Sequence, residues 1–270
     1  MTILVTGGTG LVGSRLLPRF VDAVDCRALV RQGREVPAGS TPVEGDLLEA
    51  DSLKQAVEGV SAIVHLAAGF RTQNEDDIWR ANLDGTKNLI AAAKARAPQV
   101  RFVMASTGLV YDADASHPGL EDDATNPKLA YPVSKIAAEN GLRNSGLNWS
   151  ILRLPFVYGD GDGHLAAVPE VVARFKWHPA KTFSLVHHRD VARAVELALT
   201  GVMDGRIVNI VDDTPTTVYE IASLVGSPIE PSAEPLTDPW MGRMDGSRSR
   251  ALGFHPTVPT VYQAMQQGIL

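Results

Sequence analysis

The chain has 270 residues, of which 44% are hydrophobic, and a formal net charge of −6, which is typical of an ordinary globular protein. No run of Lys and Arg stands out, so we expect neither nucleic acid nor a membrane surface as a partner. Cys26 is the only cysteine, which excludes an intrachain disulfide and a cysteine-based metal site. We find no cleavable leader and no apolar stretch near the ~20 residues that span a bilayer, and we therefore expect a cytoplasmic location.

Short β-branched runs alternate with helical patterns through the first two-thirds of the chain. The strands that we predict are Ile3–Val5, Cys26–Val30, Ala62–Leu66, Val100–Ala105 and Trp149–Leu154. The helices that we predict between them are Leu11–Val21, Ser52–Val57, Asp76–Ala95 and Tyr131–Leu142. This alternation indicates an α/β fold, with a doubly wound parallel sheet covered by helices on both faces.

The pattern becomes less regular after Leu154. We predict helices at Val168–Phe175, Val191–Leu199, Gly246–Leu252 and Val258–Gln267, strands at Phe183–Val186 and Ile207–Val211, and a loop from Pro228 to Met244. These elements suggest two units. Residues 1–154, together with about 187–211, form the main domain, and residues 155–186 and 212–270 form a small discontinuous substrate lobe.

A glycine-rich turn joins the first strand to the first helix. Gly7, Gly10 and Gly13 stand in a Gly-x-x-Gly-x-x-Gly spacing that also contains Thr9, Leu11 and Val12. Such glycines permit unusual backbone angles, close approach of the backbone to phosphate, and tight packing of the helix on the strand. The positive end of the helix then faces the pyrophosphate. The turn therefore predicts a nicotinamide dinucleotide site.

Further motifs follow in order along nearly the whole chain. They are Gly45-Asp46-Leu47, His65-Leu66-Ala67-Ala68, Asn82-x-x-Gly85-Thr86, Ser106-Thr107-x-x-Val110-Tyr111, Tyr131-x-x-x-Lys135, Pro155-x-Val157-Tyr158-Gly159 and Val186-His187-x-x-Asp190. In this order they resemble the extended short-chain dehydrogenase/reductase family, which is NAD-dependent epimerase/dehydratase-like and has a Rossmann fold. The resemblance implies that Asp46 and Leu47 contact the adenine, and that the cofactor is lined by Leu66, Ala67, Ala68, Pro155 and Val157.

The end of the second strand bears on the choice of nicotinamide. A free ribose usually meets an acidic residue there, whereas a 2′-phosphate needs cations. The sequence after Val30 begins with Arg31, and Arg34 follows, with no acid in the first four positions. Two arginines suit bidentate contact with a phosphate, although they are also ordinary solvated loop residues. We expect NADP(H) in preference to NAD(H).

Tyr131 and Lys135 are four residues apart, which places them on one face of a helix. A tyrosine with a pKa near 10 must exchange a proton near neutral pH, and a neighbouring ammonium stabilises the phenolate and lowers that pKa. The resemblance implies that both residues are catalytic and that Lys135 also holds the nicotinamide ribose.

Two further residues match catalytic positions of the family. Thr107 corresponds to a hydroxyl that holds the substrate oxygen. Ser106 is the competing choice, but its side chain is expected to face the opposite way on a strand. Asn82 matches the fourth catalytic member, which organises water or helix backbone near the lysine, and the alternative is an Asn that only bonds local backbone.

We predict no metal site. Asp160-x-Asp162-x-His164 resembles a cation loop, but Val171 stands where an EF-hand needs a Glu, and we interpret the segment as a mobile loop over the site. His187 and His188 lack an evident third ligand. Trp177 and His178 either line the substrate cavity or pack the lobe.

Three functions remain open for this pattern. We favour a dehydrogenase or reductase that exchanges hydride with a small-molecule carbonyl or alcohol. The second is a nucleotide-sugar epimerase or dehydratase with retained cofactor. No arginine stands just before the segment that ends in His187-x-x-Asp190, where many such enzymes grip the diphosphate, although Arg174, Lys176, Lys181 or Arg243 are possible substitutes. The third is a non-catalytic NADP sensor.

The resemblance also implies a homodimer. Its interface would be the helices at Asp76–Ala95 and Tyr131–Leu142, whose apolar positions could equally face the chain's own sheet.

Overall fold

A parallel sheet dominates the computed structural model, which describes residues 1–20, 24–70, 72–111 and 114–270. Within these ranges seven strands pair in the order β10-β6-β5-β4-β1-β2-β3. Their bounds are β1 Thr2–Thr6, β2 Asp25–Val30, β3 Thr41–Glu44, β4 Ala62–His65, β5 Arg101–Thr107, β6 Asn148–Leu154 and β10 Arg206–Asn209. Every pairing is parallel, which confirms the predicted Rossmann-type α/β fold.

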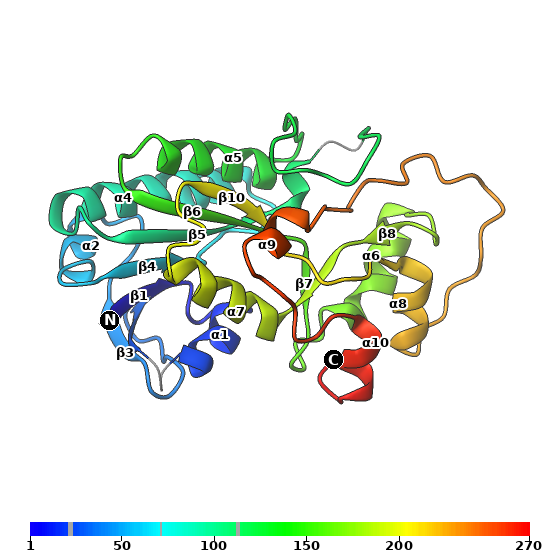
Figure 1. Cartoon of the computed structure of the whole chain (residues 1–270), viewed down its shortest axis with the longest axis horizontal. Helices are drawn as coiled ribbons and strands as arrows, with labels where there is room; N and C mark the ends of the chain where they lie inside the picture. Colours follow the sequence, from blue (N-terminus) through cyan, green and yellow to red (C-terminus); the bar gives the residue numbers. More distant parts are fainter. Residues whose placement is uncertain (21–23, 71, 112–113) are drawn as a thin grey trace.

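Helices cover both faces of this sheet (Figure 1). On one face lie α2 (Ala50–Ala56), α4 (Gly85–Arg96) and α5 (Ala130–Arg143), and on the other α1 (Gly13–Phe20) and α7 (His188–Leu199). The buried strands Ile3–Val5 and Ala62–Val64 are apolar at consecutive positions and therefore contribute side chains to both layers.

The structure differs from the predicted elements at several points. β3 was not predicted because this edge strand contains no buried residue. The helix expected at Leu11–Val21 begins at Gly13, and Val21 lies outside the described residues. The single helix expected at Asp76–Ala95 consists of α3 (Glu75–Trp79), a π-helical turn η1 (Arg80–Asp84) and α4.

A second core lies beside the sheet. Its elements are β7 (Phe156–Tyr158), η3 (Leu165–Ala167), α6 (Val168–Phe175), β8 (Thr182–Phe183), β9 (Leu185–His187), β11 (Thr216–Thr217), α8 (Val218–Leu224) and α10 (Val261–Gln266). The strand expected at Phe183–Val186 is two strands, because β8 pairs with β11 and β9 with β7. α8 was not predicted, although Thr217 and Glu220 form a capping box at its start.

The loop at Gly159–Gly163 is tied down on several sides, so its interpretation as a mobile loop is wrong. Asp160 forms an ion pair with Arg19 of α1 at 2.8 Å, and its backbone N–H donates to Ile269. Asp162 is buried against His188, with 2.9 Å between Oδ2 and Nε2. These contacts join the loop to three separate segments.

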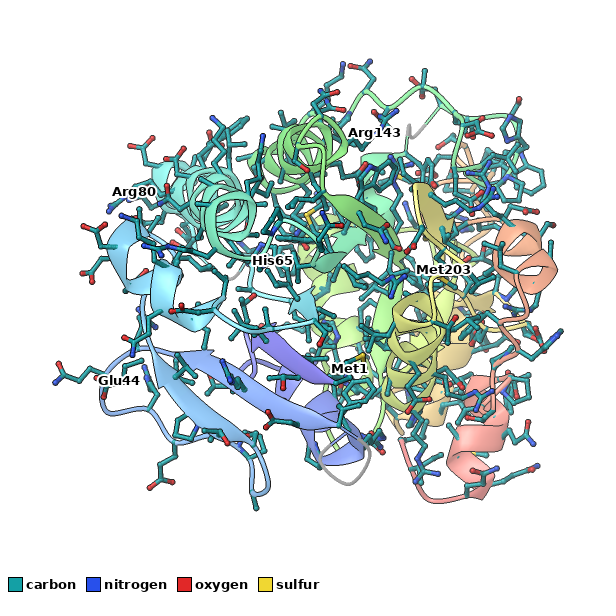
Figure 2. All side chains as sticks on the ribbon, turned by 60° about the vertical axis from the view of Figure 1, so that its left-hand side comes forward. Met1, Glu44, His65, Arg80, Arg143 and Met203 are labelled. Carbon is teal, nitrogen blue, oxygen red and sulfur yellow. The ribbon has the colours of Figure 1, made fainter. Side chains whose placement is uncertain are left out.

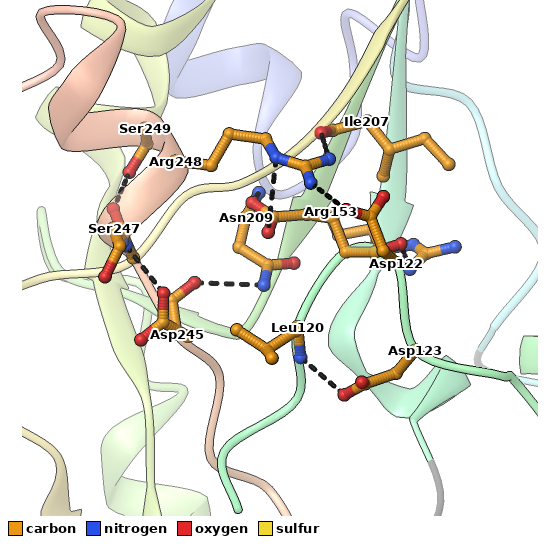
Figure 3. Close-up of polar contacts among 12 residues, drawn as sticks. Leu120, Asp122, Asp123, Arg153, Ile207, Asn209, Asp245, Ser247, Arg248 and Ser249 are labelled. Atoms are coloured by element: carbon orange, nitrogen blue, oxygen red, sulfur yellow. Dashed lines mark hydrogen bonds and ion pairs between the residues drawn. The ribbon is translucent and has the colours of Figure 1, made fainter.

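The short helix α9 (Ser247–Ala251) is anchored to the edge of the sheet (Figure 3). Arg248 donates to the Ile207 carbonyl at 3.2 Å and to Asp122 at 2.5 Å. Asn209 of β10 donates from its side chain to the carbonyl oxygens of Gly119 and Asp245. The segment before α9 is thereby held near the carboxyl end of β10.

A buried ion pair fixes α5 to the sheet. Arg153 of β6 and Glu139 of α5 are almost fully buried and lie 2.8 Å apart from Nη2 to Oε2. Arg153 also donates from Nε to Glu139, and Ser106 of β5 donates to the same carboxylate at 2.5 Å. Three elements of the sheet and helix layer therefore meet at one carboxylate.

We expect Arg153→Met to lower the free energy of unfolding by about 3–5 kcal/mol, because it leaves the Glu139 carboxylate buried without its cation. The control is Arg101→Met, which removes a more exposed ion pair with Asp204 and should cost about 1 kcal/mol or less. Urea unfolding of the three proteins measures both changes. Equal losses in the two variants would contradict the assigned role of the buried pair.

Candidate active site at the carboxyl edge of the sheet

The segments predicted to bind a cofactor all follow the carboxyl ends of parallel strands. In chain order they are Gly7–Gly13 after β1, Arg31 and Arg34 after β2, Asp46 and Leu47 after β3, Leu66–Ala68 after β4, and Pro155 and Val157 after β6. β1 lies between β4 and β2, so the strand order reverses there. In open parallel sheets ligands bind at such a reversal.

The geometry of the glycine turn fits a dinucleotide. Gly7 has φ +74°, and a Cβ on it would lie 2.6 Å from the Ala67 nitrogen. A Cβ on Gly13 would collide with the Gly7 carbonyl oxygen, so both positions require glycine for internal reasons. A Cβ on Gly10 would meet only the Gly7 oxygen, at 3.2 Å, and would otherwise enter open space. Gly10 therefore leaves room for a close ligand such as a phosphate.

The remaining predicted cofactor residues are placed around this turn. Ala67 donates from its backbone to Thr6 Oγ1 at 3.4 Å, which holds the end of β4 against the end of β1. Asp46 accepts a hydrogen bond from the Leu48 N–H, and the Leu47 carbonyl accepts one from Asn88 of α4. Val157 lies in β7, next to Val186 of β9.

Arg31 and Arg34 are both exposed and belong to one turn, in which the Arg34 N–H donates to the Arg31 carbonyl at 3.1 Å. The β2–β3 register also places the exposed Glu44 beside Val30 at the same edge. This acid was not foreseen, because β3 itself carried no sequence signal.

Thr107, Tyr131 and Lys135 come together at the end of β5. Tyr131 and Lys135 lie in the first turns of α5, which packs against β5, and the Thr107 side chain is near enough to the Tyr131 phenol to influence its pKa. Burial raises the pKa of Tyr131 to about 12, and the nearby Thr107 side chain acts in the opposite direction. The sequence predicted a lowered pKa, and in this structure the loss of solvation outweighs the stabilisation of the phenolate.

Lys135 is 2% exposed. Burial lowers its pKa to about 8, although the nearby Glu139 carboxylate favours the charged form. Within residues 1–20, 24–70, 72–111 and 114–270 its ammonium makes no hydrogen bond or ion pair. The ammonium at the end of this largely buried side chain is therefore available to an external hydrogen-bond acceptor.

A chain of buried hydrogen bonds connects the glycine turn to the π-helical turn before α4. Thr6 Oγ1 lies 2.6 Å from His65 Nδ1, and His65 Nε2 lies 2.8 Å from Thr86 Oγ1. Thr86 already donates its proton to the Asn82 carbonyl at 2.6 Å, so its oxygen must accept from His65. The proton of neutral His65 is therefore on Nε2, and Thr6 donates to Nδ1. Figure 2 places His65 in the interior of the molecule.

Asn82 extends this chain to α5. Its amide nitrogen donates to Ser134 Oγ and to the Gly69 carbonyl, both at 3.0 Å, and its oxygen accepts the Gly69 N–H at 2.8 Å. Ser134 donates in turn to the Tyr131 carbonyl at 2.7 Å. Asn82 thus contacts the backbone of the loop after β4 and, through Ser134, the backbone of α5.

The two hydroxyls at the end of β5 have different partners. The Ser106 hydroxyl donates to Glu139, whereas the Thr107 hydroxyl accepts the Leu109 N–H and lies near the Tyr131 phenol. This difference favours Thr107 over Ser106 for contact with a substrate. Among the described residues, no cluster of three or more His, Cys, Asp or Glu could hold a metal ion. In the same ranges no helix is both long and apolar enough to cross a membrane.

Some residues at this edge of the sheet were not predicted from the sequence to belong to the site. Glu139 follows Lys135 by four residues, and Arg153 is a lone charge in an apolar strand, so both carried a signal of a buried partner. Phe70 carried none, yet its ring lies 4.5 Å from that of Tyr131. Only the folded chain brings the loop after β4 to the start of α5.

The buried His65 predicts a dependence of stability on pH. Burial, and secondarily Lys135, lowers its pKa from 6.5 to about 3. Below pH 6.5 the unfolded chain therefore binds a proton that the folded chain refuses, and stability falls as the pH decreases towards 3. Relative to His65→Gln, the wild type should lose up to about 1.4 kcal/mol per pH unit between pH 6 and pH 4.

Urea unfolding at several pH values measures this difference. His255→Gln, at an exposed histidine, is the control and should keep the wild-type dependence. A constant difference between wild type and His65→Gln over this range would show that His65 is not buried in its neutral form.

Comparisons with known proteins place this geometry among enzymes that use nicotinamide cofactors. The chain is 29% identical to 4-hydroxy-2-methyl-3-oxo-4-farnesyl-3,4-dihydroquinoline-1-oxide ketoreductase of Stigmatella aurantiaca, over 83% of this chain and 72% of that protein. It is 34% identical to UDP-glucose 4-epimerase of Azospirillum brasilense, but over only 53% of this chain and 44% of that protein. The chain thus spans less than half of the epimerase's length in that match.

Solved structures share the architecture. MoeE5 in complex with UDP-glucuronic acid and NAD superposes with a TM-score of 0.81 at 25% identity, and the match covers 98% of this chain and 97% of that one. Residues 3–211 also match the model of the NAD dependent epimerase/dehydratase family. The protein is therefore a member of the NAD-dependent epimerase/dehydratase family.

Proposed function

We propose that this protein is an NAD(P)-dependent oxidoreductase that transfers hydride between the nicotinamide and a carbonyl or alcohol carbon. The observation that carries the proposal is the contact of Tyr131 with Thr107, with Lys135 buried one helical turn further on. These groups lie at the carboxyl edge of the sheet. The glycine turn after β1, which packs against Ala67 after β4, lies at the same edge.

The cofactor, when bound, supplies or accepts the hydride, and the side chains of the chain manage the oxygen of the substrate. Thr107 holds that oxygen by a hydrogen bond, and Tyr131 delivers its phenolic proton to it during reduction. Lys135 stabilises the phenolate that remains. Asn82 positions the start of α5 through its hydrogen bond to Ser134, which bonds the Tyr131 carbonyl. In the oxidative direction the proton returns to Tyr131.

Residues 155–186 and 212–270 are the proposed substrate lobe. They contribute most of the second hydrophobic core, and the segment before α9 contacts the end of β5, because Met244 packs against Gly108. A substrate on Thr107 would therefore lie between the sheet and this lobe.

Nucleotide-sugar epimerisation is the second candidate. It is favoured by the solved structure of MoeE5 with UDP-glucuronic acid and NAD, which covers nearly the whole chain. Incubation with NADPH or NADH and a panel of carbonyls and nucleotide sugars separates the two functions. Net oxidation of the cofactor supports a reductase, whereas sugar interconversion without net oxidation supports an epimerase.

Tyr131→Phe should lower kcat by about 10²–10⁴-fold, the usual contribution of a positioned acid, while the cofactor Kd changes little. The substitution keeps the ring that contacts Phe70 and removes only the hydroxyl. Tyr219→Phe, at an exposed tyrosine of α8, serves as the control with wild-type turnover. Steady-state kinetics and cofactor titration provide the measurements, and full activity of Tyr131→Phe would refute the assignment.

NADP(H) is the proposed cofactor, on the evidence of Arg31 and Arg34 in one exposed turn after β2. NAD(H) remains the alternative, with Glu44 beside Val30 in its favour. Arg31→Ala and Arg34→Ala should each raise the Kd of NADPH about 10-fold or more, as loss of a charge-assisted hydrogen bond does, and leave that of NADH nearly unchanged. The exposed Arg96→Ala is the control. Comparable wild-type affinities, or tighter NADH, would overturn this preference.

A further inference from the structure

Three large apolar side chains remain exposed around the Thr107–Tyr131 pair. Phe70, Leu109 and Leu129 are 51%, 50% and 71% exposed. Leu109 is two residues after Thr107, Leu129 is two residues before Tyr131, and the Phe70 ring contacts the ring of Tyr131. We call these three residues the apolar rim. They come from three separate segments that the fold brings to one place.

Backbone hydrogen bonds hold Leu109, Leu129 and Gly69, the residue before Phe70. Asn82 binds both the N–H and the carbonyl of Gly69, the residue before Phe70. The Leu109 N–H donates to Thr107 Oγ1 at 3.2 Å, and the Leu129 carbonyl accepts the Val133 N–H at the start of α5. Leu109 and Leu129 are thus attached to the same backbone segments that carry Thr107 and Tyr131.

The lobe continues this apolar character. Met244 is buried against Gly108, between Thr107 and Leu109, and Gly242 packs against the ring of Phe183. The Phe183 ring in turn lies 5.3 Å from that of Trp177, which is partly exposed. Buried apolar contacts thus run from Gly108, the residue after Thr107, into the lobe.

The charge of Lys181, in the lobe, is already balanced by a carboxylate. Lys181 is 3% exposed and forms an ion pair with Asp238 at 3.2 Å, while its ammonium lies over the ring of Trp177. A diphosphate would have to compete with that carboxylate. Lys181 is therefore a poor substitute for the arginine that grips a diphosphate.

We infer that the substrate is a carbonyl compound with an alkyl or aryl group beside its reacting carbon, and that this group lies on the apolar rim. A carbonyl oxygen held between Thr107 and Tyr131 places its carbon substituents within a few ångström of these side chains. An apolar substituent there would remove them from water, which is favourable in proportion to the covered area. The inference rests on the proposed oxidoreductase function and specifies its substrate class.

The test is a series of methyl ketones from 2-butanone to 2-decanone, reduced with NADPH and NADH. In the wild type kcat/KM should rise about 2- to 4-fold for each added methylene until the rim is covered. Leu129→Ser and Leu109→Ser should each lower the ratio of kcat/KM for 2-decanone to that for 2-butanone about 10-fold. Val202→Ser, at an exposed apolar residue between α7 and β10, is the control and should keep the wild-type ratio.

The outcomes distinguish this inference from the function on which it rests. Turnover of the ketones with no dependence on chain length, or with a dependence that both rim variants keep, overturns the inference and leaves the oxidoreductase intact. Interconversion of a nucleotide sugar with no turnover of any ketone overturns both. Thermal unfolding of each variant verifies that a changed ratio does not come from loss of fold.

Discussion

The hydrogen bonds of His65 connect the two halves of the candidate site. Its ring accepts from Thr6, the residue directly before the glycine turn, and donates to Thr86, which bonds the backbone of Asn82. Asn82 in turn reaches α5 through Ser134. All five side chains are buried, and a buried polar group that loses its partner is costly. The glycine turn and α5 therefore cannot shift independently without breaking this chain of hydrogen bonds.

The same burial determines the electrostatics of the reaction centre. Removal from water raises the pKa of Tyr131 and lowers that of Lys135 and of His65, and in each case it favours the uncharged form. His65 is thus a neutral connector with a fixed tautomer. Glu139 opposes the effect at Lys135, and its own charge is balanced by Arg153. One buried ion pair thereby both anchors α5 and stabilises the ammonium beside the proposed acid.

Prediction from the sequence succeeded where the physical signal is local. The buried strands appear as apolar runs, and the turn at Gly7, Gly10 and Gly13 appears as spaced glycines whose need the structure explains at Gly7 and Gly13. It failed where packing elsewhere decides the outcome. β3 contains no buried residue, and the π-helical turn at Arg80–Asp84 interrupts an otherwise helical pattern. The tie between Asp160 and Arg19 spans 141 residues, so a glycine-rich segment that seemed mobile is in fact held.

The sequence by itself determined the α/β class, the glycine turn and the placement of Tyr131 and Lys135 one turn apart on a helix, because helical and strand periodicity and short spacings are properties of neighbouring residues. Only the tertiary structure decided that Ser106 serves Glu139 while Thr107 meets Tyr131, that Asn82 holds Gly69, and that Phe70 lies on Tyr131. Each of these contacts joins residues that are distant in the chain, and side-chain geometry alone selects between equally plausible partners. The arrangement around the apolar rim, and with it the substrate class that we infer, depends on such contacts.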